Sequence, residues 1–156
     1  DRLSLVKTSD GLHYDLVTRL RCDSMPNETA LLFGPSDELY LLVRREIGGA
    51  TGVWGESRPP YTEWEWNDLG IRLGGPNLCA LPDGSILIGS REVQKEPHCG
   101  LYGLDGSKRA ELLLRLPSGG DCSYPGMVVR GNKLFVSYYS AHEGKCAIYL
   151  SELKIK

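Results

Sequence analysis

Short hydrophobic runs separated by turn residues dominate the chain. Residues 39–43, 86–88 and 134–138 are rich in Leu, Ile, Val and aromatic residues, and they are too short for helices but typical of strands. Gly/Asp and Gly/Asn turns at residues 83–84 and 131–132 precede two of these runs and favour hairpins. Residues 110–116 have helical propensity, but they span barely two turns, so we expect a strand there as well.

An internal repeat organises these runs. Each repeat has an apolar strand, a turn containing Gly or Asp, a second apolar strand, and a polar residue at the end of that strand. The repeats cover residues 28–44, 77–91 and 124–139. Leu39, Ile86 and Leu134 hold equivalent positions at intervals of 47 and 48 residues. A period in the forties that contains four short strands is typical of β-propeller blades.

The repeat predicts an all-β fold, a single partial β-propeller over residues 1–156. Its expected parts are the outer strands of one blade (1–20), two four-stranded blades (27–66 and 77–116) and the inner strands of a last blade (124–156). Closed propellers need four to eight blades. About three blades therefore make half of a six-bladed ring, completed by dimerisation or by a missing N-terminal half. A β-sandwich is the main rival fold, but it does not explain the repeat.

Composition and charge narrow the classes of function. The formal net charge of −2 and the lack of a basic run argue against a nucleic-acid partner. No apolar run approaches the roughly 20 residues of a membrane helix. Five widely spaced cysteines, an odd number, and no visible signal peptide favour buried thiols in a cytoplasmic protein over a disulfide framework. Three histidines without a close pair argue against a metal site, and we expect no cofactor.

Several stretches resemble a known family. Residues 27–33, Asn-Glu-Thr-Ala-Leu-Leu-Phe, followed by a turn and a strand ending in Arg44, resemble the Glu-to-Arg blade of sialidases and sialidase-like glycoside hydrolases. Residues 8–14 resemble a shortened Asp-box, the Ser-x-Asp-x-Gly-x-x-aromatic turn of such blades, with one residue missing before the Gly. Residues 119–126 and 136–145 resemble the family's last blade. The resemblance covers nearly all of this chain and the C-terminal half of the family's six-bladed ring.

This resemblance implies a glycosidase site. In sialidases a Tyr nucleophile is activated by a Glu, three Arg bind the sugar carboxylate, and an Asp is the acid/base. On this chain Tyr124 matches the nucleophile and Glu28 its base, and Arg44 and Arg91 match two of the arginines. No residue here matches the first Arg or the acid/base Asp, which the family places in its N-terminal half.

Blade geometry indicates the same place independently of the family. The inner strand of a propeller blade begins, and the second strand ends, on one face of the disc. Six polar or aromatic residues hold these positions: Glu28, Asn77 and Tyr124 at inner-strand starts, and Arg44, Arg91 and Tyr139 at second-strand ends. We therefore expect all six at one mouth of the channel, with Asn77 and Tyr139 as further substrate-binding candidates.

These residue types suit a glycan partner. Paired guanidinium groups bind a carboxylate, and a Tyr beside a Glu can serve as the nucleophile of a retaining glycosidase. Simpler interpretations compete, because strand-end arginines often pair with neighbouring carboxylates, and Trp64 and Trp66 could pack between blades rather than bind sugar. The sequence predicts a sialidase-like glycoside hydrolase or, alternatively, a non-catalytic carbohydrate-binding or self-assembling propeller.

Overall fold

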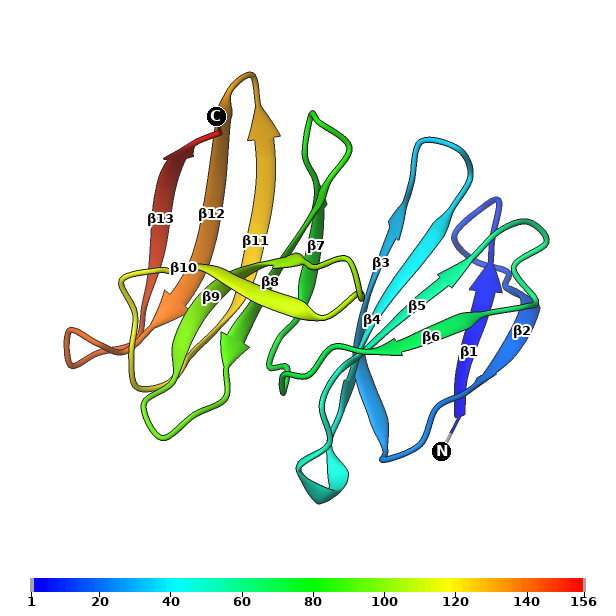
Figure 1. Cartoon of the computed structure of the whole chain (residues 1–156), viewed down its shortest axis with the longest axis horizontal. Coiled ribbons are helices and arrows are strands. Elements are labelled where there is room, and N and C mark those ends of the chain that lie inside the picture. Colours follow the sequence, from blue (N-terminus) through cyan, green and yellow to red (C-terminus); the bar gives the residue numbers. More distant parts are fainter. Residues whose placement is uncertain (1, 156) are drawn as a thin grey trace.

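The structure is a computed structural model that describes residues 2–155. Within these residues thirteen strands form four antiparallel sheets, and a single 3-10 turn, η1 (Ile47–Gly49), interrupts them (Figure 1). The predicted all-β fold is confirmed, and the segment with helical propensity is a strand, β10 (Ala110–Arg115). No helix in the described part of the chain is long and hydrophobic enough to span a membrane.

The four sheets follow one another along the chain, and in each sheet every strand pairs with the next one in sequence. The first sheet consists of β1 (Arg2–Lys7) and β2 (Asp15–Arg21). The second consists of β3 (Pro26–Phe33), β4 (Leu39–Arg45), β5 (Val53–Ser57) and β6 (Glu65–Asp68). The third consists of β7 (Asn77–Ala80), β8 (Ile86–Glu92), β9 (His98–Leu104) and β10. The fourth consists of β11 (Cys122–Arg130), β12 (Lys133–Ser140) and β13 (Ala147–Lys154).

Each sheet packs its hydrophobic face on the next, so the core is divided into three layers. Between the first and second sheets Leu20 meets Val43. Between the second and third sheets Leu42 meets Ile88, and between the third and fourth sheets Leu101 meets Val136. Figure 1 shows the resulting array, with the two-stranded sheet at one end and the three-stranded sheet at the other. The two incomplete sheets therefore lie farthest apart.

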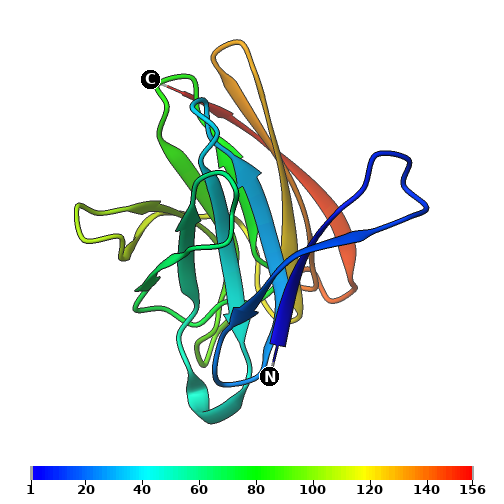
Figure 2. The same ribbon diagram turned by 90° about the vertical axis from the view of Figure 1, so that its right-hand side faces the viewer.

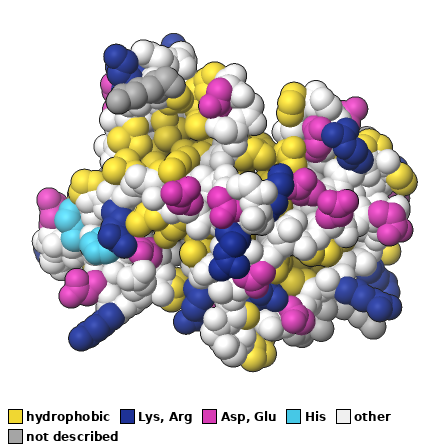
Figure 3. Space-filling view, viewed as in Figure 1, with side chains coloured by type: hydrophobic (Ala, Val, Ile, Leu, Met, Phe, Trp, Pro, Cys, Tyr) yellow, Lys and Arg dark blue, Asp and Glu magenta, His cyan; other side chains and the backbone are white. Residues whose placement is uncertain are grey.

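The sheets differ in how much of their surface is covered. Strand β4 is buried on both faces over most of its length, whereas β3 alternates between partly buried and exposed positions. Seen from the side in Figure 2, the turn between β1 and β2 projects away from the other sheets. Figure 3 shows hydrophobic side chains gathered over the fourth sheet, while acidic and basic side chains lie close together across the middle of the same face.

The first strand of each of the last three sheets, β3, β7 and β11, is the innermost strand of its sheet. A residue with a left-handed φ lies near the start of each of these strands. These residues, Met25, Gly75 and Tyr124, have φ angles of 56°, 55° and 51°, and each precedes a proline. Proline favours extended backbone for the residue before it, so the left-handed φ at these three positions is imposed by the fold and not by the proline. A left-handed φ is common for Gly but unusual for a bulky residue such as Tyr.

The packing of Trp64 and Trp66 and the state of the cysteines bear on two of the sequence predictions. Trp64 and Trp66 stack with ring centroids 5.6 Å apart and pack, partly buried, against the layer between the first and second sheets. This placement agrees with the packing interpretation rather than with an open sugar platform. All five cysteines are free thiols. Cys99 and Cys122 are buried beside each other between the third and fourth sheets, where burial raises the pKa of both thiols.

Candidate functional site

Two of the candidate residues lie in irregular parts of innermost strands. The pairing of β3 with β4 shifts register between Pro26 and Thr29, which places Glu28 in a bulge. The pairing of β11 with β12 shifts between Ser123 and Gly126, and this second bulge contains Tyr124. Bulges of this kind redirect side chains and are frequent next to active sites. The burial alternation of β11 is irregular around Tyr124, whereas Glu28 keeps its place in the alternation of β3.

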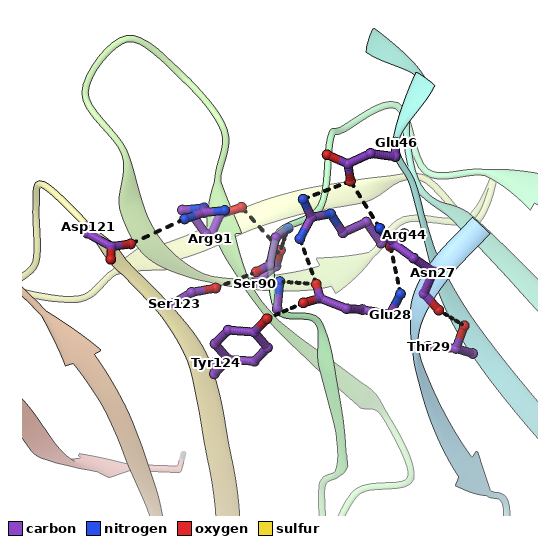
Figure 4. A network of polar contacts seen from close by, with 12 residues as sticks. Asn27, Glu28, Thr29, Arg44, Glu46, Ser90, Arg91, Asp121, Ser123 and Tyr124 are labelled. Carbon is purple, nitrogen blue, oxygen red and sulfur yellow. Dashed lines mark hydrogen bonds and ion pairs between the residues drawn. The ribbon is translucent and has the colours of Figure 1, made fainter. Parts of the chain in front are cut away.

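The Glu28 carboxylate joins three sheets at one point (Figure 4). Its Oε2 atom accepts a hydrogen bond of 2.7 Å from Nη1 of Arg44, near the end of β4, and one of 3.0 Å from the backbone N–H of Gly75, just before β7. Its Oε1 atom accepts a hydrogen bond from the hydroxyl of Tyr124, which lies 96 residues further along the chain. The pairing of Tyr124 with Glu28 is the contact that a nucleophile and its base require.

Gly75 is the residue that lets the third sheet approach so closely. A Cβ atom at this position would lie 2.4 Å from Oγ of Ser123 and 2.9 Å from the backbone N of Tyr124, and the φ of Gly75 is already left-handed. The preceding residue, Gly74, is anchored on both sides, because Ser123 donates to its carbonyl and its N–H donates to Ser90 at 3.0 Å. The loop before β7 thus positions Tyr124 as well as Glu28.

The second terminal nitrogen of Arg44 binds another carboxylate. Nη2 of Arg44 lies 2.8 Å from Oε2 of Glu46, which also accepts a hydrogen bond of 3.2 Å from the side chain of Asn27. The Arg44 side chain is only 19% exposed, so the two carboxylates hold its guanidinium in a fixed place. Burial lowers the pKa of Arg44, but the bonds to Glu28 and Glu46 outweigh this effect and raise it overall.

Arg91, Asp121 and Tyr139 form a second cluster beside the first. Nη1 of Arg91 lies 3.6 Å from Oδ1 of Asp121, and the hydroxyl of Tyr139 donates to the same oxygen at 2.8 Å. The ring of Tyr139 stacks on that of Tyr124 with centroids 6.2 Å apart. The structure therefore brings Arg91 and Tyr139 to the neighbourhood of Tyr124, and a carboxylate already accompanies Arg91.

Asn77 links two innermost strands. Its Nδ2 donates to the carbonyl of Pro125 at 2.9 Å, and its Oδ1 accepts from the backbone N–H of Leu78 at 2.8 Å. These bonds occupy both ends of the amide, so Asn77 positions the strand that carries Tyr124. Asn77 also borders a shallow hollow of about 110 Å³ beside Tyr124. Ligand pockets typically enclose about 300–1,000 Å³, so this hollow is smaller than a complete ligand pocket.

The electrostatics assign a resting protonation state to the central pair. Partial burial raises the pKa of Glu28, but hydrogen bonds from Tyr124, Arg44 and Gly75 outweigh it, and the pKa is lowered overall. The hydrogen bond to Glu28 is the largest cause of a raised pKa at Tyr124. At neutral pH the pair is therefore a carboxylate and a protonated phenol. Burial and the bond to Asp121 raise the pKa of Tyr139 to about 12.

Sequence reasoning missed several residues of this network. The sequence assigns no role to Glu46, Ser123, Gly75 or Asp121. One signal could have located the Gly75 loop. A proline recurs near the start of the first strand in each repeat, at positions 26, 76 and 125. Among residues 2–155 no group of three or more His, Cys, Asp or Glu side chains could hold a metal ion.

Comparison with known proteins identifies the fold. Neither a protein-family model nor a curated protein sequence matches the chain. A solved structure of a Dyadobacter fermentans protein of unknown function is similar, with a TM-score of 0.81 and 22% identity over 98% of this chain and 45% of that chain. An α-L-arabinanase from Penicillium chrysogenum, complexed with arabinobiose, is similar with a TM-score of 0.69 and 12% identity, over 86% of this chain and 47% of that chain.

A third similar structure is the α-L-arabinofuranosidase Arb93A from Fusarium graminearum in complex with an iminosugar inhibitor. It matches with a TM-score of 0.70 and 13% identity, over 98% of this chain and 49% of that chain. The chain spans less than half the length of each of these proteins. The likenesses confirm the predicted partial β-propeller, and this chain shares its fold with one half of glycoside hydrolase propellers.

Proposed function

We propose that this chain supplies half of a glycoside hydrolase site, with Tyr124 as the nucleophile and Glu28 as its base. The observation that carries this proposal is the hydrogen bond between the Tyr124 hydroxyl and the Glu28 carboxylate at the start of two innermost strands. The resemblance to sialidases supports the same assignment. Propellers of the same fold bind arabinobiose and an iminosugar inhibitor, which supports a sugar as the ligand.

The geometry suits a retaining reaction. As the Tyr124 oxygen forms a bond to the anomeric carbon of the sugar, Glu28 takes the phenol proton, and the glycosidic C–O bond breaks. The leaving oxygen takes a proton from an acid that the other half of the ring would contribute. In the second step water attacks the anomeric carbon and gives a proton to the conjugate base of that acid. The bond between the sugar and the Tyr124 oxygen breaks, and Glu28 returns its proton to the phenolate, which restores both groups. Arg44 and the Gly75 N–H keep Glu28 ionised and aimed at the phenol.

The remaining candidates have supporting roles in this proposal. Arg91 and Tyr139 border the ring of Tyr124 and would contact the bound sugar, while Arg44 would contact it from the opposite side of Glu28. Asn77 acts through Pro125 by holding the strand that carries the nucleophile. A sialidase would use Arg44 and Arg91 to bind a sugar carboxylate directly, and the carboxylates that already accompany these arginines bear on whether this site does so.

Hydrolysis of a broad panel of aryl glycosides by the purified, assembled protein tests this proposal. We expect Tyr124→Phe to lower kcat at least a hundredfold while the protein stays folded, because it removes the attacking oxygen and leaves the ring in place. Tyr149→Phe is the matched control, since the Tyr149 hydroxyl also donates to a glutamate, Glu143, at 2.9 Å. Equal activity of wild type and Tyr124→Phe, or no release from any substrate, would contradict the proposal.

A non-catalytic carbohydrate-binding propeller is the second candidate function. Two observations favour it. The hollow beside Tyr124 is small, and no residue of the chain matches the acid/base Asp of the sialidase pattern. The same panel separates the two functions when it is paired with a glycan array. Retained sugar binding without hydrolysis would select the binding module.

A further inference from the structure

The charges around Tyr124 bear on the kind of sugar that the proposed site takes, and this inference rests on the proposed function. Arg44, a candidate for binding a sugar carboxylate, already has two carboxylate partners. Its Nη1 lies 2.7 Å from Glu28 and its Nη2 lies 2.8 Å from Glu46. A guanidinium binds a carboxylate best through two parallel N–H donors. Both terminal nitrogens of Arg44 already donate to protein carboxylates.

Glu46 is itself held in place. The side chain of Asn27 donates to the Oε2 atom of Glu46 at 3.2 Å, the same oxygen that faces Arg44. The backbone N–H of Glu46 is bonded to the carbonyl of Ser24 at 2.9 Å, which ties the end of β4 to the turn before β3. An incoming carboxylate would have to displace a partner that is anchored through both its side chain and its backbone.

Arg91 is the second candidate, and it too has a companion carboxylate. Asp121 lies 3.6 Å from Nη1 of Arg91 and is fixed by the Tyr139 hydroxyl at 2.8 Å. The guanidinium of Arg91 lies against Gly74, where an added Cβ would be 2.8 Å from Nε, so backbone covers one side of it. Both arginines of the network therefore already have a carboxylate partner beside Tyr124.

The network as a whole is negative. Its two arginines are accompanied by three carboxylates, those of Glu28, Glu46 and Asp121 (Figure 4). An anionic sugar brought to Tyr124 would meet one negative charge more than positive charges. A neutral sugar meets no such repulsion, and its hydroxyl groups can donate to the free lone pairs of the same carboxylates. The exposed ring of Tyr124, stacked on Tyr139, offers an apolar surface for the sugar ring.

We infer that the site takes an uncharged glycosyl group rather than a sugar that bears a carboxylate. The carboxylates of Glu46 and Asp121 accept hydrogen bonds from sugar hydroxyls, and the arginines serve mainly to hold these carboxylates. This assignment differs from the sialidase substrate class, although the nucleophile and its base are the same residues. Glu46 becomes a specificity-determining residue, because it occupies the arginine nitrogen that a sugar carboxylate would need.

An NMR titration of the isotope-labelled, assembled protein tests the inference, with the Gly75 amide as the reporter. The probes are methyl arabinofuranoside and methyl glucoside, which are neutral, and N-acetylneuraminate and glucuronate, which are anionic. We expect the neutral sugars to shift the Gly75 signal with an affinity at least tenfold higher than that of the anionic ones. Added salt should narrow this ratio, because it screens the repulsion.

Substitution at Glu46 makes the test specific. Glu46→Gln removes one negative charge and releases Nη2 of Arg44, so the ratio of neutral to anionic affinity should fall at least fivefold. Glu143→Gln, a glutamate paired with Tyr149 instead, is the matched control and should leave the ratio unchanged. Anionic sugars that bind as tightly as neutral ones would overturn this inference and leave the proposed function standing. No shift with any sugar would overturn the proposed function itself.

Discussion

The hydrogen bonds of the Glu28 side chain depend on the packing of three sheets. Its carboxylate is satisfied only when the second, third and fourth sheets are all in place, because its partners come from β4, the loop before β7, and β11. The same bonds separate the pKa values of the two reacting groups, lowering that of Glu28 and raising that of Tyr124. The proton therefore stays on Tyr124 until a substrate draws the phenol oxygen toward carbon.

The coupling between these two groups predicts a change in the titration of Tyr124. We expect Glu28→Gln to lower the pKa of Tyr124 toward the ordinary tyrosine value of about 10, because the largest cause of its elevation is removed. Ultraviolet difference spectra or NMR of labelled tyrosine rings would follow the ionisation. Tyr149, whose pKa is raised by burial and by its hydrogen bond to Glu143, provides an internal control that should not move. An unchanged Tyr124 titration would refute the coupling.

The lowered pKa of Glu28 also predicts a dependence of stability on pH. A carboxylate whose pKa is lower in the folded state stabilises the fold above its unfolded value of about 4.3, and this stabilisation is lost as pH falls through the folded pKa. Urea unfolding between pH 7 and pH 3 should show a smaller loss of stability for Glu28→Gln than for wild type. Parallel curves for the two proteins would count against an ionised Glu28 in the native state.

At the scale of elements, the site is built from turns and bulges rather than from the bodies of strands. A left-handed residue precedes a proline near the start of β3, β7 and β11; in β3 a bulge follows this residue, and in β11 the bulge contains it. A left-handed φ at a residue such as Tyr124 costs on the order of 1–3 kcal/mol. The contacts of Ser123, Gly75 and Glu28 around Tyr124 hold this conformation in place.

The Gly75 turn predicts a sharp sensitivity to one methyl group. Gly75→Ala should lower the free energy of unfolding by about 3 kcal/mol, since the left-handed backbone and the collision with Ser123 add together. Gly84→Ala is the matched control, because Gly84 also has a left-handed φ but nothing lies within 4 Å of an added Cβ. We expect a loss of about 1 kcal/mol there. Urea unfolding measures both, and equal losses would exclude the steric role of Gly75.

Sequence reasoning reached the strands and part of the site for identifiable reasons. Glu28 and Arg44 lie on paired strands of one sheet, and Tyr124 follows from the repeat, so local pattern was enough to place them near one another. Glu46 and Asp121 escaped notice as partners of the arginines because their contacts depend on how loops and side chains settle. An ion pair between strand ends leaves no periodic trace in a sequence.

At the scale of the whole molecule, the two ends of the array are uncovered. The pairing of β11, β12 and β13 places Val128, Ile148 and Leu150 on one exposed face of the fourth sheet. Toward the other end, Leu31 and Phe33 are exposed on β3, the first strand of the sheet next to the incomplete two-stranded sheet. Hydrophobic faces of this kind usually mark places where another surface packs. We propose that a second copy of the chain covers both ends and closes the ring, so that the acid of the proposed reaction is another carboxyl group of that copy and not the Asp of the sialidase pattern.

Closure by a second copy predicts a dimer whose stability depends on these faces. Light scattering after size-exclusion chromatography should give twice the mass of one chain, and Leu150→Glu should halve it by placing a charge in the contact. Leu113→Glu is the matched control, because Leu113 is exposed on β10, at the outer edge of a complete sheet. A monomeric wild type would exclude the second copy as the covering partner.

The turn that starts each innermost strand has a consequence for how such a molecule can change over time. Three chemically unrelated residues, Met25, Gly75 and Tyr124, share a left-handed φ, and a proline follows each of them. The position therefore accepts different side chains, while the backbone around it stays the same. A single substitution at one of these positions would change the chemical group that is presented there and leave the strand pairing of every sheet intact.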